Sequence, residues 1–144
     1  MGWPWIEFVR WPYDDDASHF CVRASNGVYV AAQEFYGYPA DIERFGRALA
    51  GFPRNRADEA HFEAGRPDLG WAHWLLLRAY LVDAAGRAAM LFQSRDGAED
   101  PWRGEARFTI HCEVASLNRL GAALIAWGSR EGVTVREELA PWGA

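Results

Sequence analysis

Alternating apolar and polar residues divide the first part of the chain into short strands. Residues 5–11 alternate well enough for a strand, although Pro4 and Pro12 restrict it to a short or edge position. In residues 19–35, two β-prone stretches meet at Asn26 and Gly27, which both tolerate the positive φ angles of a type I′ turn. This segment is therefore predicted to be a β-hairpin.

Two segments change to a helical period. Residues 39–52 begin with Pro39 and end at Gly51, and their apolar residues are spaced to share one face: Ile42, Phe45, Leu49 and Phe52. Residues 116–128 show the same spacing, with Ser116 as the candidate N-cap, Gly128 as the stop, and one apolar stripe: Leu117, Leu120, Leu124 and Trp127. Both segments are predicted to be amphipathic helices.

The stretch between these helices returns to strand patterns. A short strand is expected at residues 61–65, and a central strand at 72–83, where apolar residues occupy both alternating faces. Turns then lead into strands at 87–95 and 106–115, so the last three strands should form a meander.

These elements predict an α+β fold: a mainly antiparallel sheet of about six strands with the two amphipathic helices packed on one face. The 144 residues are enough for one domain with a substantial core, so residues 1–144 are read as a single domain. The pattern assigns no structure to the tail from about residue 129.

Charge and composition narrow the classes of partner. The net charge is −5, and the fifteen basic residues are all arginines scattered along the chain. This pattern argues against a nucleic-acid groove or an anionic membrane surface and favours a basic protein partner. No apolar run reaches the roughly 20 residues that span a bilayer, and the first sixteen residues lack the features of a signal peptide, so a cytoplasmic location is expected. The two cysteines make no disulfide framework.

One predicted strand carries the main candidate site. In residues 107–114, Phe108, Ile110 and Cys112 should point to the core, while four polar side chains should share the opposite face: Arg107, Thr109, His111 and Glu113. Cys112 is therefore read as a buried structural thiol, and His111 cannot act on it as a base. The polar face, joined by His73 from the central strand, could bind a partner or support acid–base chemistry.

Three other groups suggest sites but favour ordinary structural roles. His19 and Cys21 have a spacing that could supply two zinc ligands, yet the chain offers no further ligand motif, so no metal site is predicted. Asp14, Asp15 and Asp16 lack the pattern of a calcium loop and are read as a solvated turn. The tryptophans Trp3, Trp5 and Trp11 could stack on a base or sugar, but core and cover over one sheet face is favoured.

The order of elements from about Phe20 to Trp127 resembles the WapI-like immunity proteins of bacterial polymorphic-toxin systems. The resemblance lies in the hairpin, "DIERFGRALAGFP", "HFEAG", "VDAAGR" and "FTIHCEVASLNRLGAALIAWG". It covers about three quarters of the chain and implies a cytoplasmic inhibitor that binds a toxin's catalytic domain without doing chemistry. The family offers no binding motif that could be placed on numbered residues here.

We therefore expect a non-enzymatic protein-binding domain, with an immunity protein that neutralises a basic toxin domain as its leading form. The chain has no GxSxG, phosphate-binding or dinucleotide motif, and no cofactor is predicted. The alternative is a small-molecule-binding domain or enzyme that uses the polar sheet face around His111 and Glu113. A dimerisation module that uses exposed aromatic residues is a third hypothesis.

Overall fold

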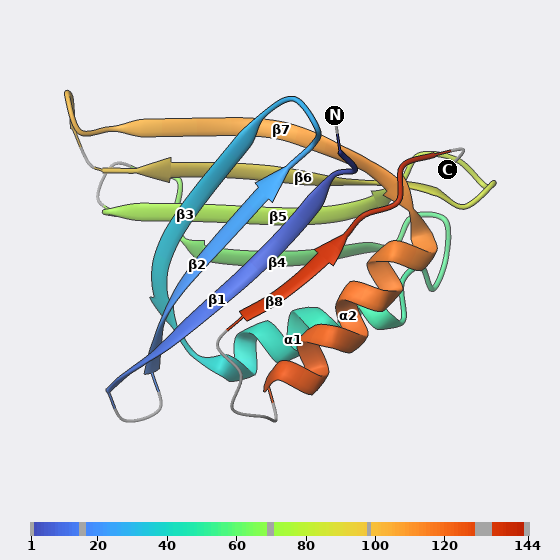
Figure 1. Ribbon diagram of the computed structural model, residues 1–144, viewed down its shortest axis with the longest axis horizontal. Coiled ribbons are helices and arrows are strands. Elements are labelled where there is room, and N and C mark those ends of the chain that lie inside the picture. Colours follow the sequence, from blue (N-terminus) through green and yellow to red (C-terminus); the bar gives the residue numbers. More distant parts are fainter. Residues whose placement is uncertain (1, 15–16, 69–70, 98, 129–133, 143–144) are drawn as a thin grey trace.

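A computed structural model describes residues 2–14, 17–68, 71–97, 99–128 and 134–142. It confirms an α+β fold, with two helices and two four-stranded antiparallel sheets (Figure 1). The expectation of one sheet with about six strands is wrong, because the strands divide between two sheets that cross each other. No helix within the described ranges is long and apolar enough to cross a membrane.

Sheet A has the strand order β3-β2-β1-β8 and joins the two ends of the chain. Its strands are β1 (Trp5–Asp14), β2 (Ala17–Ser25), β3 (Val30–Gly37) and β8 (Thr134–Glu138). The expectation that β1 is short or at an edge is wrong, because β1 has ten residues and lies between β2 and β8. Its pairing with β8 ends at Val9, and its register with β2 shifts between Pro12 and Asp14, so Pro12 lies beyond the stretch where β1 needs two partners.

Sheet B has the order β4-β5-β6-β7 and confirms the predicted meander. Its strands are β4 (Glu59–Gly65), β5 (His73–Leu81), β6 (Arg87–Asp96) and β7 (Gly104–Glu113). On β5 and β7, buried and more exposed residues alternate, which places one face of the sheet against the core. The strand β5 packs against β3 of sheet A, whereas the sequence pattern places one of its faces under the helices.

The helices α1 (Pro39–Ala50) and α2 (Val114–Gly128) lie against each other at one side of the two sheets (Figure 1). They contact β4 of sheet B and β8 of sheet A, which are edge strands, and so do not lie on one face of a single sheet as expected. Covering these edges leaves fewer unpaired strand edges open to solvent.

The two helices approach so closely that glycines are required where they cross. A Cβ atom at Gly121 would lie 2.4 Å from the backbone nitrogen of Ala50 and 2.5 Å from the carbonyl oxygen of Gly46. Asn118 adds a polar link, because its Nδ2 donates to the carbonyls of Leu49 at 2.9 Å and Phe52 at 2.8 Å. These carbonyls lie at and just beyond the end of α1, where the regular helical hydrogen bonds stop.

The N-terminus of α2 differs from the sequence expectation. The helix begins at Val114, directly after β7, and not after a cap at Ser116. Ser116 is buried within the first turn, where its Oγ accepts hydrogen bonds from the backbone N–H of Ala140 and from Arg119, both at 2.9 Å. Its hydroxyl therefore anchors the C-terminal segment, while Gly128 ends the helix as predicted.

A single core joins the inner faces of both sheets with the helices. Its largest fully buried side chains include Phe8, Phe20, Phe45 and Phe92, which come from three strands and one helix. Cys112 is fully buried in this core, as predicted, and burial raises the pKa of its thiol to about 12. Both cysteines are free thiols.

Candidate functional site

The alternation predicted for β7 is confirmed. Phe108, Ile110 and Cys112 are buried, whereas Arg107 and His111 are exposed and Thr109 and Glu113 are partly exposed. The four polar residues therefore lie on the outer face of sheet B, but they do not form one cluster.

His73 does not join this group. It shares its alternation on β5 with Leu75 and Leu77, which are fully buried, and so belongs to the inner side of sheet B. In register, His111 is level with Tyr80 of β5, seven residues from His73, which is about 23 Å along a strand. Burial lowers the pKa of His73, partly offset by the charge of Asp96. The expectation that His73 and His111 form one site is wrong.

Polar residues of β7 line two different hollows in the protein surface. Thr109 and His111 line a groove of about 420 Å³ at the edge of sheet B. Arg107 lines a different hollow of about 290 Å³, beside the buried Arg95. Arg95 donates hydrogen bonds to the backbone carbonyls of Pro67, Asp68 and Trp71, so its guanidinium holds a loop in place.

We call the first hollow the tip groove, because it adjoins the tip of the β2–β3 hairpin. Three segments that are distant in sequence form its walls: the N-terminal residues, the hairpin turn, and β7 with the C-terminal segment. Its lining residues are Gly2, Trp3, Pro4, Asn26, Gly27, Val28, Thr109, His111 and Pro141.

Asn26 builds one wall of the tip groove. Its Oδ1 accepts the backbone N–H groups of Val28 at 2.9 Å and Tyr29 at 2.8 Å, which folds the turn locally. Its Nδ2 donates to the carbonyl of Thr109 at 3.3 Å and so ties the turn to the edge of β7. The predicted hairpin is confirmed, but its turn is centred one residue later than expected, on Gly27 and Val28, and is closed by the Asn26 N–H to the Tyr29 carbonyl. Gly27 supplies the positive φ of 94° that this turn needs.

The opposite wall is formed by His111 and the C-terminal segment. The imidazole of His111 stacks on the Trp142 indole, with ring centroids 4.7 Å apart and an interplanar angle of 8°. The Trp142 Nε1 donates to the carbonyls of Ala88 and Cys112 at 3.1 and 3.0 Å. His111 is therefore held in place by an aromatic ring that is itself anchored to the backbone of β6 and β7.

An apolar surface borders the tip groove. Val28, Tyr29 and Val30, which we call the apolar tip, are consecutive and 69%, 64% and 63% exposed. Trp3, across the groove, is 49% exposed. A run of three exposed apolar residues is costly for a soluble protein unless it serves a contact. Sequence reasoning missed this feature, although the letters "VYV" directly after a turn were its visible signal.

The other candidate groups fall outside the tip groove. His19 and Cys21 share the outer face of sheet A as predicted, but the His19 Nε2 contacts Glu34 at 3.2 Å. Within the part of the chain that the structure describes, no three His, Cys, Asp or Glu side chains are arranged to hold a metal ion. Burial and the charge of Glu34 raise the pKa of the Cys21 thiol, which makes it a weaker nucleophile. Asp15 and Asp16 lie outside the described residues.

None of the three N-terminal tryptophans belongs to the core, so the expectation that they contribute to it is wrong. Trp5 and Trp11 lie on the outer face of sheet A, because the intervening Ile6 and Phe8 point inward. Trp3 lines the tip groove instead.

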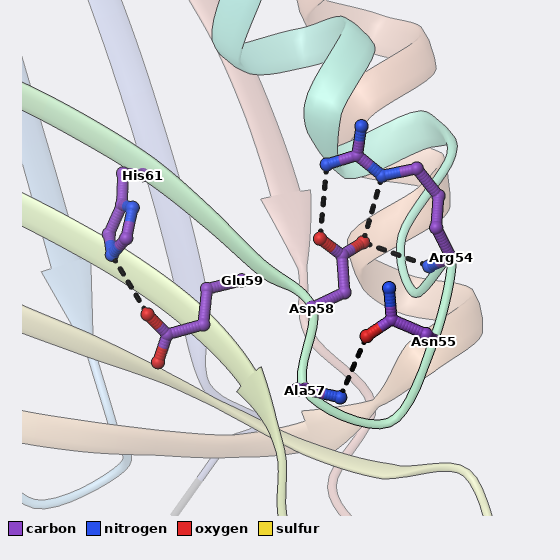
Figure 2. Close-up of polar contacts among 6 residues, drawn as sticks. All are labelled: Arg54, Asn55, Ala57, Asp58, Glu59 and His61. Atoms are coloured by element: carbon purple, nitrogen blue, oxygen red, sulfur yellow. Dashed lines mark hydrogen bonds and ion pairs between the residues drawn. The ribbon is translucent and has the colours of Figure 1, made fainter.

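The connection between α1 and β4 contains a carboxylate with a strongly structural role. Asp58 accepts two hydrogen bonds from the Arg54 guanidinium and one from the Arg54 backbone N–H (Figure 2). These hydrogen bonds lower the pKa of Asp58, and those from the Arg54 side chain have the largest effect. On β4, Figure 2 shows His61 directed to Glu59, 3.2 Å away. The Arg54–Asp58 pair closes a loop, and the His61–Glu59 pair lies on β4. Both pairs lie apart from the tip groove.

Comparisons with protein-family models, with curated proteins and with solved structures found no match to this chain.

Proposed function

We propose that this protein is a non-enzymatic protein-binding domain whose contact surface is the tip groove together with the apolar tip. The observation that carries the proposal is the exposure of Val28, Tyr29 and Val30 in sequence, beside a groove that contains two of the predicted site residues, Thr109 and His111. Exposed apolar anchors next to a hollow are typical of protein interfaces, where a few such residues dominate the binding energy.

Within that class, an immunity protein that neutralises a toxin domain is the leading form. Its support is the resemblance in element order to the WapI-like immunity proteins and the net charge of −5, which suits a basic partner. Such a protein would act in the bacterial cytoplasm by covering the toxin, without catalysis.

Site-specific photo-crosslinking in the native host tests the proposal. A benzophenone amino acid placed at Tyr29 should crosslink to one defined protein, which mass spectrometry then identifies. The matched control is the same amino acid at Trp102, a large apolar residue that is 77% exposed, in the β6–β7 loop. Equal crosslinking patterns from both positions would contradict a binding surface at the tip. If the partner is a toxin domain, coexpression of this protein should restore the growth of cells that produce the toxin domain.

The volume of the tip groove supports a second candidate, a small-molecule site that uses His111. A groove of about 420 Å³ lies within the range of ligand pockets, and His111 is a polar group held in its wall. Fragment screening by protein NMR distinguishes the two. A ligand that shifts the Thr109 and His111 amides without any protein partner at Tyr29 would favour the small-molecule role.

A further inference from the structure

The outer face of sheet A carries an alternation of aromatic and charged residues that the tip groove does not use. Sheet B packs against the opposite, inner face of sheet A (Figure 1). The outward residues of β1 are Trp5, Glu7, Val9 and Trp11. Each end of this face has an aromatic ring and a carboxylate. Trp5 and Glu7 lie at one end, and Trp11 and Glu34 of β3 lie at the other.

At one end, an arginine of the chain itself contacts both the aromatic ring and the carboxylate. The Arg136 guanidinium lies 4.1 Å from the centroid of the Trp5 ring, and its Nη1 is 3.7 Å from the Glu7 carboxylate. Arg23 approaches the other oxygen of Glu7 at 3.4 Å. A guanidinium is stabilised in such a place both by the π face of the indole and by the carboxylate.

At the other end, the same types of group surround a histidine. The His19 ring lies between Trp11 and Tyr36, with centroids 5.0 and 4.9 Å away, and these three residues are register partners across β1, β2 and β3. The His19 Nε2 is 3.2 Å from the Glu34 carboxylate. We call Trp11, His19, Tyr36 and Glu34 the aromatic row.

The exposure of the aromatic row differs from that of the Trp5 end. The Glu34 side chain is 65% exposed, whereas that of Glu7, which has two arginine partners, is 14% exposed. Trp11 and Tyr36 are 44% and 56% exposed. The aromatic row therefore presents a more exposed carboxylate and more exposed aromatic surface to a partner than the Trp5 end does.

We propose that the aromatic row is a docking site for an arginine side chain of a basic protein partner. The guanidinium would lie against the exposed part of Trp11 or Tyr36 and pair with Glu34, in the way that Arg136 contacts Trp5 and pairs with Glu7. The net charge of −5 favours approach of a basic surface. This surface is separate from the tip groove, so the proposal does not rest on the function proposed above.

An NMR titration of the full chain with the peptide acetyl-Gly-Arg-Gly-amide tests the proposal. The Trp11 indole and the amides of His19 and Glu34 should shift in a saturable way. The analogue with neutral citrulline in place of arginine has nearly the same shape, and it should bind about five- to tenfold more weakly because it lacks the charge.

Two variants separate the aromatic row from general attraction to an acidic protein. Glu34→Gln should weaken arginine-peptide binding about threefold or more, whereas Glu138→Gln, an exposed glutamate at the Trp5 end of the same sheet, should leave it unchanged. Equal shifts with the arginine and citrulline peptides would overturn the proposal. So would shifts that both variants reduce equally, or binding of chitotriose at Trp11 without any response to arginine.

Discussion

The helix crossing and the apolar tip use small and apolar residues in opposite ways. At the crossing, Gly46 and Gly121 bring two helix backbones into direct contact, with no room for a single added carbon atom. At the tip, Val28, Tyr29 and Val30 are each at least 63% exposed beside the turn that Asn26 holds, and the Tyr29 ring stacks on Phe108 with centroids 6.4 Å apart. Close packing at the crossing defines the fold, whereas the tip contributes little to it.

This difference distinguishes residues whose packing stabilises the fold from residues that the proposed function assigns to a contact surface. A buried apolar side chain contributes through burial and packing, so its replacement destabilises the fold. An exposed apolar side chain gains much less, and the proposed partner would complete its burial. The measurements below compare the two regions, beginning with the change that should affect stability most.

Gly121→Ala should destabilise the fold by about 3 kcal/mol or more, because the new Cβ would overlap the backbone of α1. Urea denaturation of purified protein measures the free energy of unfolding. Gly104→Ala is the matched control, since a Cβ there meets no atom within 4 Å and the variant should lose little stability. A Gly121→Ala variant as stable as the Gly104→Ala variant would show that the helices do not cross as described.

The free energy of unfolding should fall at high pH because the Cys112 thiol is buried. In the unfolded chain this thiol ionises near its usual pKa of 9.0, while the folded protein keeps it protonated up to about 12. The folded state thus binds more protons above pH 9, and this contribution to stability is full below pH 9 and is lost as pH rises toward 12. The slope is about 1.4 kcal/mol per pH unit. Denaturation between pH 8.5 and 10.5 should show this extra loss relative to Cys112→Ala; parallel curves would contradict a buried thiol.

Asn118→Ala should cost about 1–2 kcal/mol, because it removes the amide that donates to the carbonyls of Leu49 and Phe52 at and just beyond the end of α1. The same denaturation experiment measures the loss. Ala122→Gln, on an exposed position of α2, provides a control that should change stability by less than about 0.5 kcal/mol.

Val28→Ser should change the free energy of unfolding by less than about 0.5 kcal/mol, since Val28 is 69% exposed. Val22→Ser, on the same hairpin but fully buried, should cost about 2 kcal/mol or more, because one core methyl is lost and a hydroxyl replaces the other. Similar losses at the two positions would mean that the apolar tip contributes to the core after all.

The sequence predicts local structure well because neighbouring residues determine it. Both helices, the β2–β3 hairpin and the meander of β5, β6 and β7 depend on period and on adjacent turns. The division into two sheets depends instead on β3 and β4 not pairing, and the fourth strand of sheet A depends on the pairing of residues 5–9 with residues 134–138, across almost the whole chain. The strand β8 is short and has three charged residues among its five, so its pattern gives little sign of a strand.

The candidate site was predicted only within one strand. Alternation in β7 correctly placed Thr109 and His111 opposite Cys112, because the side-chain period of a strand is two. Alternation could not assign His73 to a face, since β5 is apolar on both faces. Nor could it align His73 with β7, because β6 lies between these two strands. Nor could it reveal Trp142 or Trp3 beside His111, because these contacts join the two ends of the chain to the middle.

The central claim is that the apolar tip is a protein-binding surface, and calorimetric titration with the partner crosslinked at Tyr29 tests it most directly. The double variant Val28→Ser/Tyr29→Ser should bind that partner at least about thirtyfold more weakly than the unmodified protein, as expected for loss of interface anchors. Trp102→Ser should bind as the unmodified protein does. Affinity of the double variant within about threefold of the unmodified protein would contradict the claim.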